Sequence, residues 1–208
     1  MTTLVVLAKA PLPGRVKTRL CPPYTPAQAA CLAGAALHDT VDACLGTRHP
    51  CVLALDGAPP TWLPPAVTVV AQPEGGLDER LAAAFTAGGG GPVVLVGMDT
   101  PQVTSAQLDA AAHAPTDAVF GPAHDGGWWL LGLRRPDPGL LLGVPASTPR
   151  TGAIQRRRLT DAGLSITELG RLRDVDTARD AAEVARAAPW TRFARLLERL
   201  PPLGAVSR

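Results

Sequence analysis

Short runs of apolar and mostly β-branched residues recur along the chain, separated by longer segments that mix apolar and polar positions. Runs of this length and composition are typical of strands buried in the middle of a sheet. The runs that predict strands are Thr3–Ala8, Cys51–Leu55, Val67–Ala71, Val93–Met98, Asp117–Phe120, Trp128–Leu133 and Leu164–Leu169.

The mixed segments predict helices, several of which begin at recognisable capping residues. Thr25 is expected to cap a helix that has Pro26 in its first turn and runs to about Leu45. Thr104 begins another helix, and Gln107 three residues later completes a capping box. Further helices are predicted at Leu77–Ala87, Thr151–Ala162, Ala178–Ala187 and Trp190–Leu200, followed by a frayed tail over 201–208.

Strands that alternate with helices predict a three-layer α/β/α sandwich with a mostly parallel sheet. The sequence contains no internal repeat and no linker that would divide it, so a single domain is expected over residues 1–200. In such folds ligands bind beyond the carboxyl ends of the strands. The segments that follow the first and fourth predicted strands are therefore the first candidates for a site.

Composition narrows the class of protein. The chain has 208 residues, of which 46% are hydrophobic, and this is enough apolar material for a core and too much for a disordered chain. A formal charge of +2 leaves no electrostatic excess for binding nucleic acid or a membrane surface. No apolar run approaches the roughly 20 residues of a spanning helix, and the N-terminus does not resemble a signal peptide. We therefore expect a cytoplasmic protein of undetermined oligomeric state.

The cysteines and histidines do not indicate a site. The cysteines have no C-x-x-C spacing, so we expect small buried apolar residues rather than a disulfide framework or a zinc site at Cys21, Cys31, Cys44 and Cys51. His38, His49 and His113 are expected to be ordinary helix or loop residues. His124 adjoins the predicted crevice, but nothing in the sequence marks it as a base.

The segment over residues 9–24 is rich in proline and in cations, and it is predicted to be a long loop. Eighteen of the twenty basic residues are arginine, and the only two lysines both lie here. Such a loop suits a polyphosphate, although a solvated basic loop is the alternative. The residues expected to bind nucleotide phosphates are Lys9, Gly14, Arg15, Lys17 and Arg19. The segment matches neither a Walker A loop nor the dinucleotide-binding glycine motif.

Three aspartates form the second candidate feature. Asp99 follows the fourth strand, and Asp174 and Asp176 lie on one side of an extended segment before a helix. Mg²⁺ binds one or two carboxylates together with substrate phosphates. Each aspartate taken alone could instead be a turn or capping residue. Together with the basic loop, they predict a site for Mg²⁺ or Mn²⁺.

Two further segments could bind an acceptor. Asp125, Gly126 and Gly127 form a turn whose glycines permit close approach by a sugar or ribose, or which is an ordinary hairpin turn. Ser147 and Thr148 precede a helix, whose start either binds an anion or is simply capped. No serine or cysteine nucleophile motif is present.

Five segments in this order resemble the DUF2064 family: AKAPLPGRVKTRL, GMDTP, GPAHDGGWWLLGL, PASTPRTG and DVDT. The resemblance covers about residues 3–187. That family belongs to the nucleotide-diphospho-sugar transferase superfamily, which has the glycosyltransferase-A fold, and it is similar in layout to the phospholactate guanylyltransferases. The resemblance implies a divalent metal on Asp99, Asp174 and Asp176, and nucleotide phosphates near Lys17 and Arg19. It implies an acceptor near 125–127 and 147–148. Met98 and Trp128 depart from the family pattern in positions that bear on the acceptor.

We therefore expect a metal-dependent nucleotidyltransferase that acts on a small phosphorylated or carboxylate acceptor and releases pyrophosphate. Lys17 and Asp99 are the expected catalytic residues, acting by positioning and charge neutralisation. A glycosyltransferase that uses a nucleotide-sugar is the first alternative, and a non-catalytic nucleotide-binding protein is the second.

Overall fold

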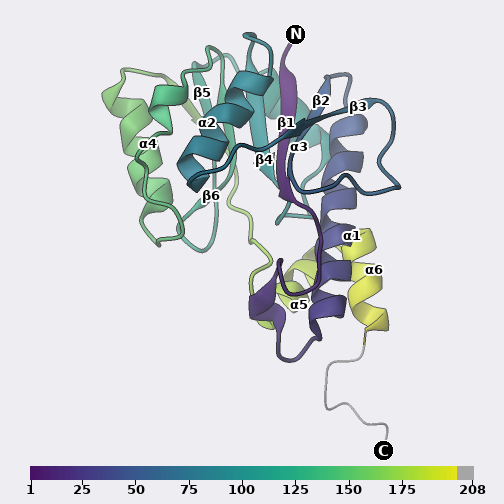
Figure 1. The fold of residues 1–208 in the computed structure, drawn as a ribbon. Helices are drawn as coiled ribbons and strands as arrows, with labels where there is room; N and C mark the ends of the chain where they lie inside the picture. Colours follow the sequence, from purple (N-terminus) through teal and green to yellow (C-terminus); the bar gives the residue numbers. More distant parts are fainter. Residues whose placement is uncertain (201–208) are drawn as a thin grey trace, which may run out of the picture.

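The computed structural model describes residues 1–200, so the predicted frayed tail over 201–208 lies outside the described residues. A seven-stranded sheet has the order β3-β2-β1-β4-β6-β5-β7 (Figure 1). Only β6 runs antiparallel to its neighbours β4 and β5. The strands are β1 (Thr3–Lys9), β2 (Cys51–Asp56), β3 (Val67–Ala71), β4 (Val93–Gly97), β5 (Ala118–Pro122), β6 (Trp128–Leu133) and β7 (Ile166–Glu168).

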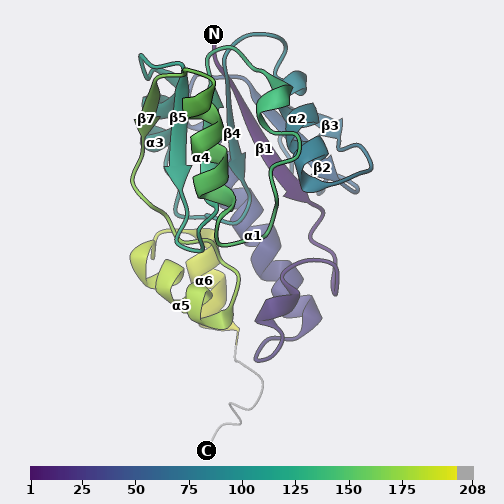
Figure 2. The ribbon, with the colours of Figure 1, turned by 90° about the vertical axis from the view of Figure 1, so that its left-hand side faces the viewer.

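Helices cover both faces of the sheet, as the prediction of three layers requires (Figures 1 and 2). Helices α1 and α3 pack on one face, and α2 and α4 pack on the other. The helices are α1 (Pro26–Leu45), α2 (Leu77–Ala87), α3 (Ser105–Ala112), α4 (Thr151–Asp161), α5 (Ala178–Ala187) and α6 (Arg192–Arg199). Within residues 1–200, no helix combines the length and the apolar character needed to cross a membrane.

The central strands are buried on both faces because successive side chains point in opposite directions. Along β1, Leu4 and Val6 belong to the core beneath α1 and α3, whereas Val5 belongs to the core beneath α2 and α4. All three side chains are fully buried. This explains why the strand is a continuous apolar run rather than an alternating one.

A third apolar cluster lies beyond the carboxyl edge of the sheet, where α5 and α6 pack on the lower half of α1 (Figure 1). Its buried side chains include Leu32, Val184 and Phe193. Asp39 of α1 caps α6 by accepting hydrogen bonds from the backbone N–H groups of Arg192 (2.9 Å) and Phe193 (2.8 Å). This cluster holds the segment before α5 next to the loop that follows β1.

The predicted capping residues are confirmed, and most element boundaries agree with the sequence analysis. Thr25 and Thr104 each accept a hydrogen bond from the backbone N–H of the glutamine three residues later. The last helix starts later than predicted, because Thr191 rather than Trp190 provides the cap. The segment predicted to be irregular also contains a short 3₁₀ turn, Thr18–Leu20.

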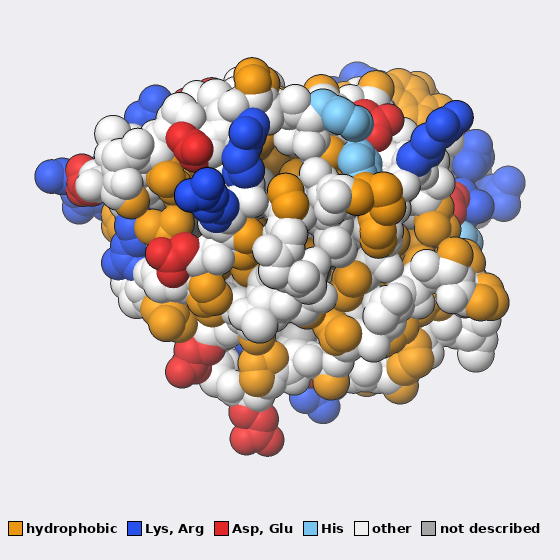
Figure 3. Space-filling view, turned by 90° about the horizontal axis from the view of Figure 1, so that it is seen from above, with side chains coloured by type: hydrophobic (Ala, Val, Ile, Leu, Met, Phe, Trp, Pro, Cys, Tyr) orange, Lys and Arg blue, Asp and Glu red, His pale blue; other side chains and the backbone are white. Residues whose placement is uncertain are grey.

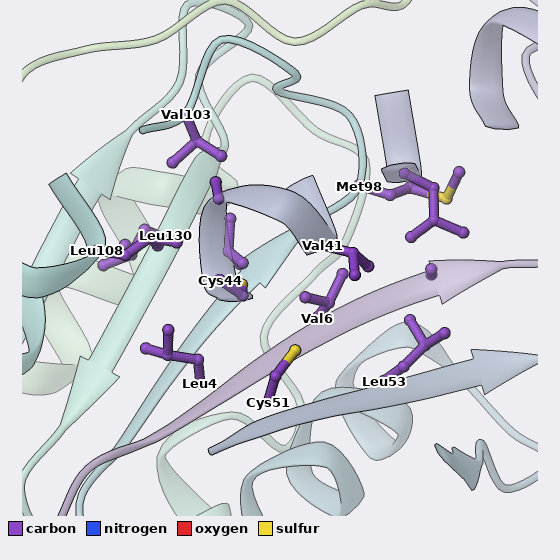
Figure 4. Close-up of a cluster of buried hydrophobic side chains, with 14 of the residues drawn as sticks. Leu4, Val6, Val41, Cys44, Cys51, Leu53, Met98, Val103, Leu108 and Leu130 are labelled. Carbon is purple, nitrogen blue, oxygen red and sulfur yellow. The ribbon is translucent and has the colours of Figure 1, made fainter. Parts of the chain in front are cut away.

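The prediction of four buried cysteines is right for two of them. Cys44 and Cys51 are buried in the core between α1 and β2, among side chains such as Leu4 and Val6 (Figure 4). Cys31 is exposed, because it lies on the outer face of α1, and Cys21 is half-buried. All four are free thiols.

Candidate active site

A cleft of about 1010 Å³ opens at the carboxyl edge of the sheet, where the loops after β1 and β4 meet. Most of the residues predicted from the sequence line it: Lys9, Arg15, Lys17, Arg19, Asp99, Asp125, Gly127, Ser147, Thr148, Asp174 and Asp176. Gly14 and Gly126 are not among the lining residues. Groups far apart in the sequence are therefore brought to a single cavity.

A backbone hydrogen bond brings the two acidic segments together. The N–H of Val175 donates to the carbonyl oxygen of Asp99 at 2.9 Å. This bond fixes the residue between Asp174 and Asp176 beside the end of β4. The structure therefore brings the three aspartates together, as predicted. The hydrogen bond from Val175 involves only the backbone of Asp99, so the Asp99 side chain takes no part in it.

Lys17 connects these carboxylates. Its Nζ lies 2.8 Å from Oδ1 of Asp99 and 3.4 Å from Oδ1 of Asp176, and only 9% of its side chain is exposed. Burial by itself lowers the pKa of Lys17, but the attraction of Asp99 and Asp176 outweighs it and the pKa is raised. The ammonium group therefore stays charged at neutral pH.

The other cations of the loop are more accessible than Lys17. Arg19 places Nη1 3.5 Å from Oδ2 of Asp176, and 76% of its side chain is exposed. Lys9 and Arg15 are exposed on the wall of the cleft, and within residues 1–200 neither has an ion-pair partner. Lys9 and Arg15 are therefore free to reach an anionic ligand, and Arg19 is accessible to one despite its contact with Asp176.

Asp174 carries the clearest electrostatic signature of the cleft. Its pKa is raised from 3.8 to about 8, chiefly by burial and then by the negative charges of Asp125 and Asp99, while Lys17 opposes the shift. The carboxyl groups of Asp99, Asp125, Asp174 and Asp176 outnumber the two cations that contact this cluster, Lys17 and Arg19. Several carboxylate oxygens with uncompensated charge are the donor set that a hard divalent cation prefers, so these residues fit Mg²⁺ or Mn²⁺.

The glycine turn before β6 has a packing role that the sequence did not reveal. Gly126 has φ +90°, and a Cβ there would overlap the carbonyl oxygen of Pro149. The N–H of Gly152 donates to the carbonyl oxygen of Gly126 at 2.8 Å. The close approach at Gly126 is therefore made by the start of α4. Asp125 and Gly127 still face the cleft, and Oδ1 of Asp125 accepts from the N–H of Gly127 at 2.8 Å.

Backbone strain is concentrated at this cleft. Lys17 (φ +50°) and Ser147 (φ +56°) are the only non-glycine residues in the described part of the chain with a left-handed backbone. Both line the cleft. Such conformations cost about 1–3 kcal/mol each and cluster at functional sites.

At the adjacent start of α4, the N–H of Thr151 already donates to the carbonyl oxygen of Thr148 at 3.1 Å, so this helix end is less free for an anion than expected.

Gln72 and Arg80 line the cleft but were not singled out from the sequence. The amide nitrogen of Gln72 donates to the carbonyl oxygens of Ala8 (2.7 Å) and Ala54 (2.8 Å), which ties together the ends of three strands. Arg80 pairs with Asp56 at 2.8 Å. Gln72 directly follows β3, so the rule that ligands bind beyond the carboxyl ends of strands could have identified it.

The fold is that of the nucleotide-diphospho-sugar transferases. A protein from Desulfovibrio desulfuricans G20, provisionally described as a nucleotide-diphospho-sugar transferase, is 25% identical with a TM-score of 0.87, over 95% of this chain and 94% of that chain. The CTP complex of CMP:2-keto-3-deoxy-manno-octonic acid synthetase gives 12% identity and a TM-score of 0.55 over 96% and 99% of the two chains. The 2-C-methyl-D-erythritol 4-phosphate cytidylyltransferase of Thermus thermophilus gives 15% and 0.53 over 91% and 100%.

These similar structures are transferases and nucleotidyltransferases, in agreement with the transferase class expected from the sequence. No curated protein shows significant similarity to the chain. The pattern that defines the family "Uncharacterized protein conserved in bacteria (DUF2064)" matches residues 31–148, which is more than half of the chain. The chain therefore belongs to the DUF2064 family.

Proposed function

We propose that this protein is a metal-dependent nucleotidyltransferase, which transfers a nucleotidyl group from a nucleoside triphosphate to a small acceptor. Asp99, Asp174 and Asp176 would hold the divalent cation. Lys9, Arg15, Lys17 and Arg19, with the backbone around Gly14, would bind the phosphates, and the acceptor would lie near 125–127 and 147–148. Such a reaction would take place in the cytoplasm, where nucleoside triphosphates are available.

The convergence of cations and carboxylates at one end of the sheet is the observation that supports this proposal most strongly. The Nζ atom of Lys17 lies within 3.4 Å of two carboxylates that are 77 positions apart in the sequence, Asp99 and Asp176. A purely structural ion pair would not need the additional half-buried carboxyl of Asp174. The phosphates of a nucleoside triphosphate would pair with the cations of the basic loop, and its divalent cation would pair with the carboxylates.

The chemistry would rest on positioning and charge. An acceptor oxygen forms a bond to the α-phosphorus, the bond from that phosphorus to the bridging oxygen breaks, and pyrophosphate leaves. A divalent cation bound to the triphosphate withdraws negative charge from its oxygens. Lys17, together with Arg15 and Arg19, neutralises charge on the departing phosphates, and the walls of the cleft hold the reactants in line.

Glycosyl transfer from a nucleotide-sugar is the second candidate, because the Desulfovibrio desulfuricans relative is described as a nucleotide-diphospho-sugar transferase. Both reactions use the same cation and phosphate groups. They differ in the leaving group, which is pyrophosphate in one and a nucleoside diphosphate in the other. The four cations of the basic loop favour the triphosphate, which carries more negative charge than a nucleotide-sugar.

The test begins with thermal-shift measurements of the protein with each nucleoside triphosphate and nucleotide-sugar, with and without Mg²⁺ or Mn²⁺, since a ligand that binds the folded state raises its stability. Ligands that bind are then incubated with pools of phosphorylated and carboxylate acceptors. Metal-dependent release of pyrophosphate is the expected result. Release of nucleoside diphosphate would support the glycosyltransferase, and unchanged ligands in every pool would contradict both.

A further inference from the structure

Three potential metal ligands converge at the end of the sheet opposite the cleft. His49 lies in the loop that enters β2, Asp109 lies on α3, and His113 caps the C-terminal end of α3. One ligand atom from each of the three lies within 4.8 Å of the others. Figure 3 looks down on this end of the molecule and shows histidine side chains gathered beside an acidic one.

His113 is held in a tautomer suited to metal binding. Its Nδ1 lies 2.8 Å from the backbone carbonyl oxygen of Asp109. A carbonyl oxygen can only accept a hydrogen bond, so Nδ1 is the donor, and in the neutral ring Nε2 then carries the lone pair. Histidine ligands of metals commonly donate their other ring N–H to a backbone carbonyl in this way.

His49 is the buried member of the group. Only 8% of its side chain is exposed, its Nε2 lies 3.5 Å from Oδ1 of Asp109, and its ring centroid lies 5.2 Å from that of His113. The Nδ1 atom of His49 is buried and has no hydrogen-bond partner within residues 1–200. The ring nitrogen that faces Asp109 is Nε2, so Nε2 is the atom that would bind a cation there, and Nδ1 would then carry the proton of the ring.

The charge balance of the group is also incomplete. Within residues 1–200, Asp109 makes its single ion pair with His49 and none with a lysine or arginine. A histidine carries no permanent positive charge, unlike a lysine or arginine, so the carboxylate lacks a permanently cationic partner among these residues. A cation placed between the three side chains would supply one.

We propose that His49, Asp109 and His113 bind one divalent transition-metal cation of the Zn²⁺ type. Two imidazole nitrogens and one carboxylate oxygen form a ligand set that such ions accept, with a remaining position for water. The ion would clamp the loop before β2 to the end of α3. This site is independent of the proposed function, because the cleft offers oxygen ligands, which suit Mg²⁺ and Mn²⁺ instead.

The test is calorimetric titration of the full chain with Zn²⁺ at pH 7.5 in the presence of millimolar Mg²⁺. Wild type and Asp99→Asn are expected to bind one equivalent with a Kd below about 10 μM. Asp109→Asn and His113→Ala, which change residues at the surface, are expected to lose at least about tenfold in affinity. His38→Ala is the matched control, because His38 forms an i,i+4 pair with Asp42 at 3.9 Å and belongs to no such three-ligand group within residues 1–200.

Three outcomes would overturn the proposal. Weak or absent Zn²⁺ binding by wild type is the first, and equal loss in His38→Ala, which would indicate adventitious binding, is the second. Loss in Asp99→Asn alone would assign the Zn²⁺ to the cleft. Visible absorption of bound Co²⁺ provides an independent readout, since nitrogen ligation in the wild type should give a spectrum that His113→Ala lacks.

Discussion

Replacing Asp174 with asparagine should make the metal-free protein more stable, although it removes a proposed metal ligand. The folded protein keeps a proton on Asp174 up to about pH 8, whereas the ordinary pKa of the group is 3.8. Between these values the unfolded chain releases the proton more readily. The unfolded state therefore binds fewer protons, and wild-type stability falls as the pH rises through this window. Asparagine does not ionise, so the variant avoids the loss.

The size of the effect follows from the two pKa values. A rise from 3.8 to about 8 corresponds to at most about 6 kcal/mol, reached above pH 8. Asp174 lies at the wall of an open cleft, so water and movement of the neighbouring carboxylates reduce this value. We expect about 2 kcal/mol at pH 8, or a melting temperature higher by roughly 4–8 °C. Near pH 4 the difference should vanish.

The measurement is thermal or urea unfolding of both proteins from pH 4 to pH 9 in the presence of a chelator. Asp161→Asn serves as the control, because 67% of the Asp161 side chain is exposed and the residue, at the end of α4, does not line the cleft. Addition of Mg²⁺ or Mn²⁺ should then reverse the order, since only wild type retains the carboxylate and gains stability from the ion.

A difference between Asp174→Asn and wild type that does not change with pH would refute the electrostatic reasoning. So would a variant less stable than wild type at pH 8 without metal. If the pH dependence is as expected but Mg²⁺ and Mn²⁺ stabilise neither protein, the charge analysis stands and the proposed metal site does not.

Three other substitutions test separate parts of the structure. Asp99→Asn should abolish metal-dependent nucleotide binding in calorimetry and leave the circular dichroism spectrum unchanged, because the backbone of Asp99 makes the bond to the segment before α5. Lys17→Ala should weaken nucleotide binding at least about tenfold more than Lys9→Ala, and equal effects of the two substitutions would contradict the role of Lys17. The same variant should bind Mn²⁺ more tightly, because it frees the two carboxylates that Lys17 contacts. Gly126→Ala should cost about 3 kcal/mol or more in urea unfolding, against about 1 kcal/mol for Gly163→Ala, whose backbone is also left-handed but has nothing within 4 Å.

The alternation of apolar runs and capped helices was sufficient to predict the layers of the fold. The predicted ranges for Val67–Ala71, Leu77–Ala87, Trp128–Leu133 and Ala178–Ala187 coincide with elements of the structure. The sequence left open whether the turn before β6 is that of a hairpin, because a buried strand has the same composition in either direction, and the structure shows that β6 is antiparallel to β4 and β5. Nor was the exposure of Cys31, which depends on the face of α1 that meets the sheet.

Part of the candidate site could likewise be predicted from the sequence, and part of it required the tertiary structure. Lysines confined to one loop and aspartates at the ends of predicted elements are properties of the sequence, and they were enough to nominate Lys17, Asp99 and Asp176. The raised pKa of Asp174 and the left-handed backbone of Ser147 required coordinates. So did the meeting of His49 with His113, which lie 64 positions apart.

Local preferences and the order of residue types determined which elements this protein forms and which side chains end up near the ends of its strands. Distances, burial and charge balance were decided by the tertiary structure alone. The physical reason is that a carboxyl or imidazole changes its chemistry through neighbours a few ångströms away, and those neighbours come from distant parts of the chain. The backbone hydrogen bond between Val175 and Asp99 shows how the tertiary structure does this, since it helps to bring aspartates from distant segments into one cluster.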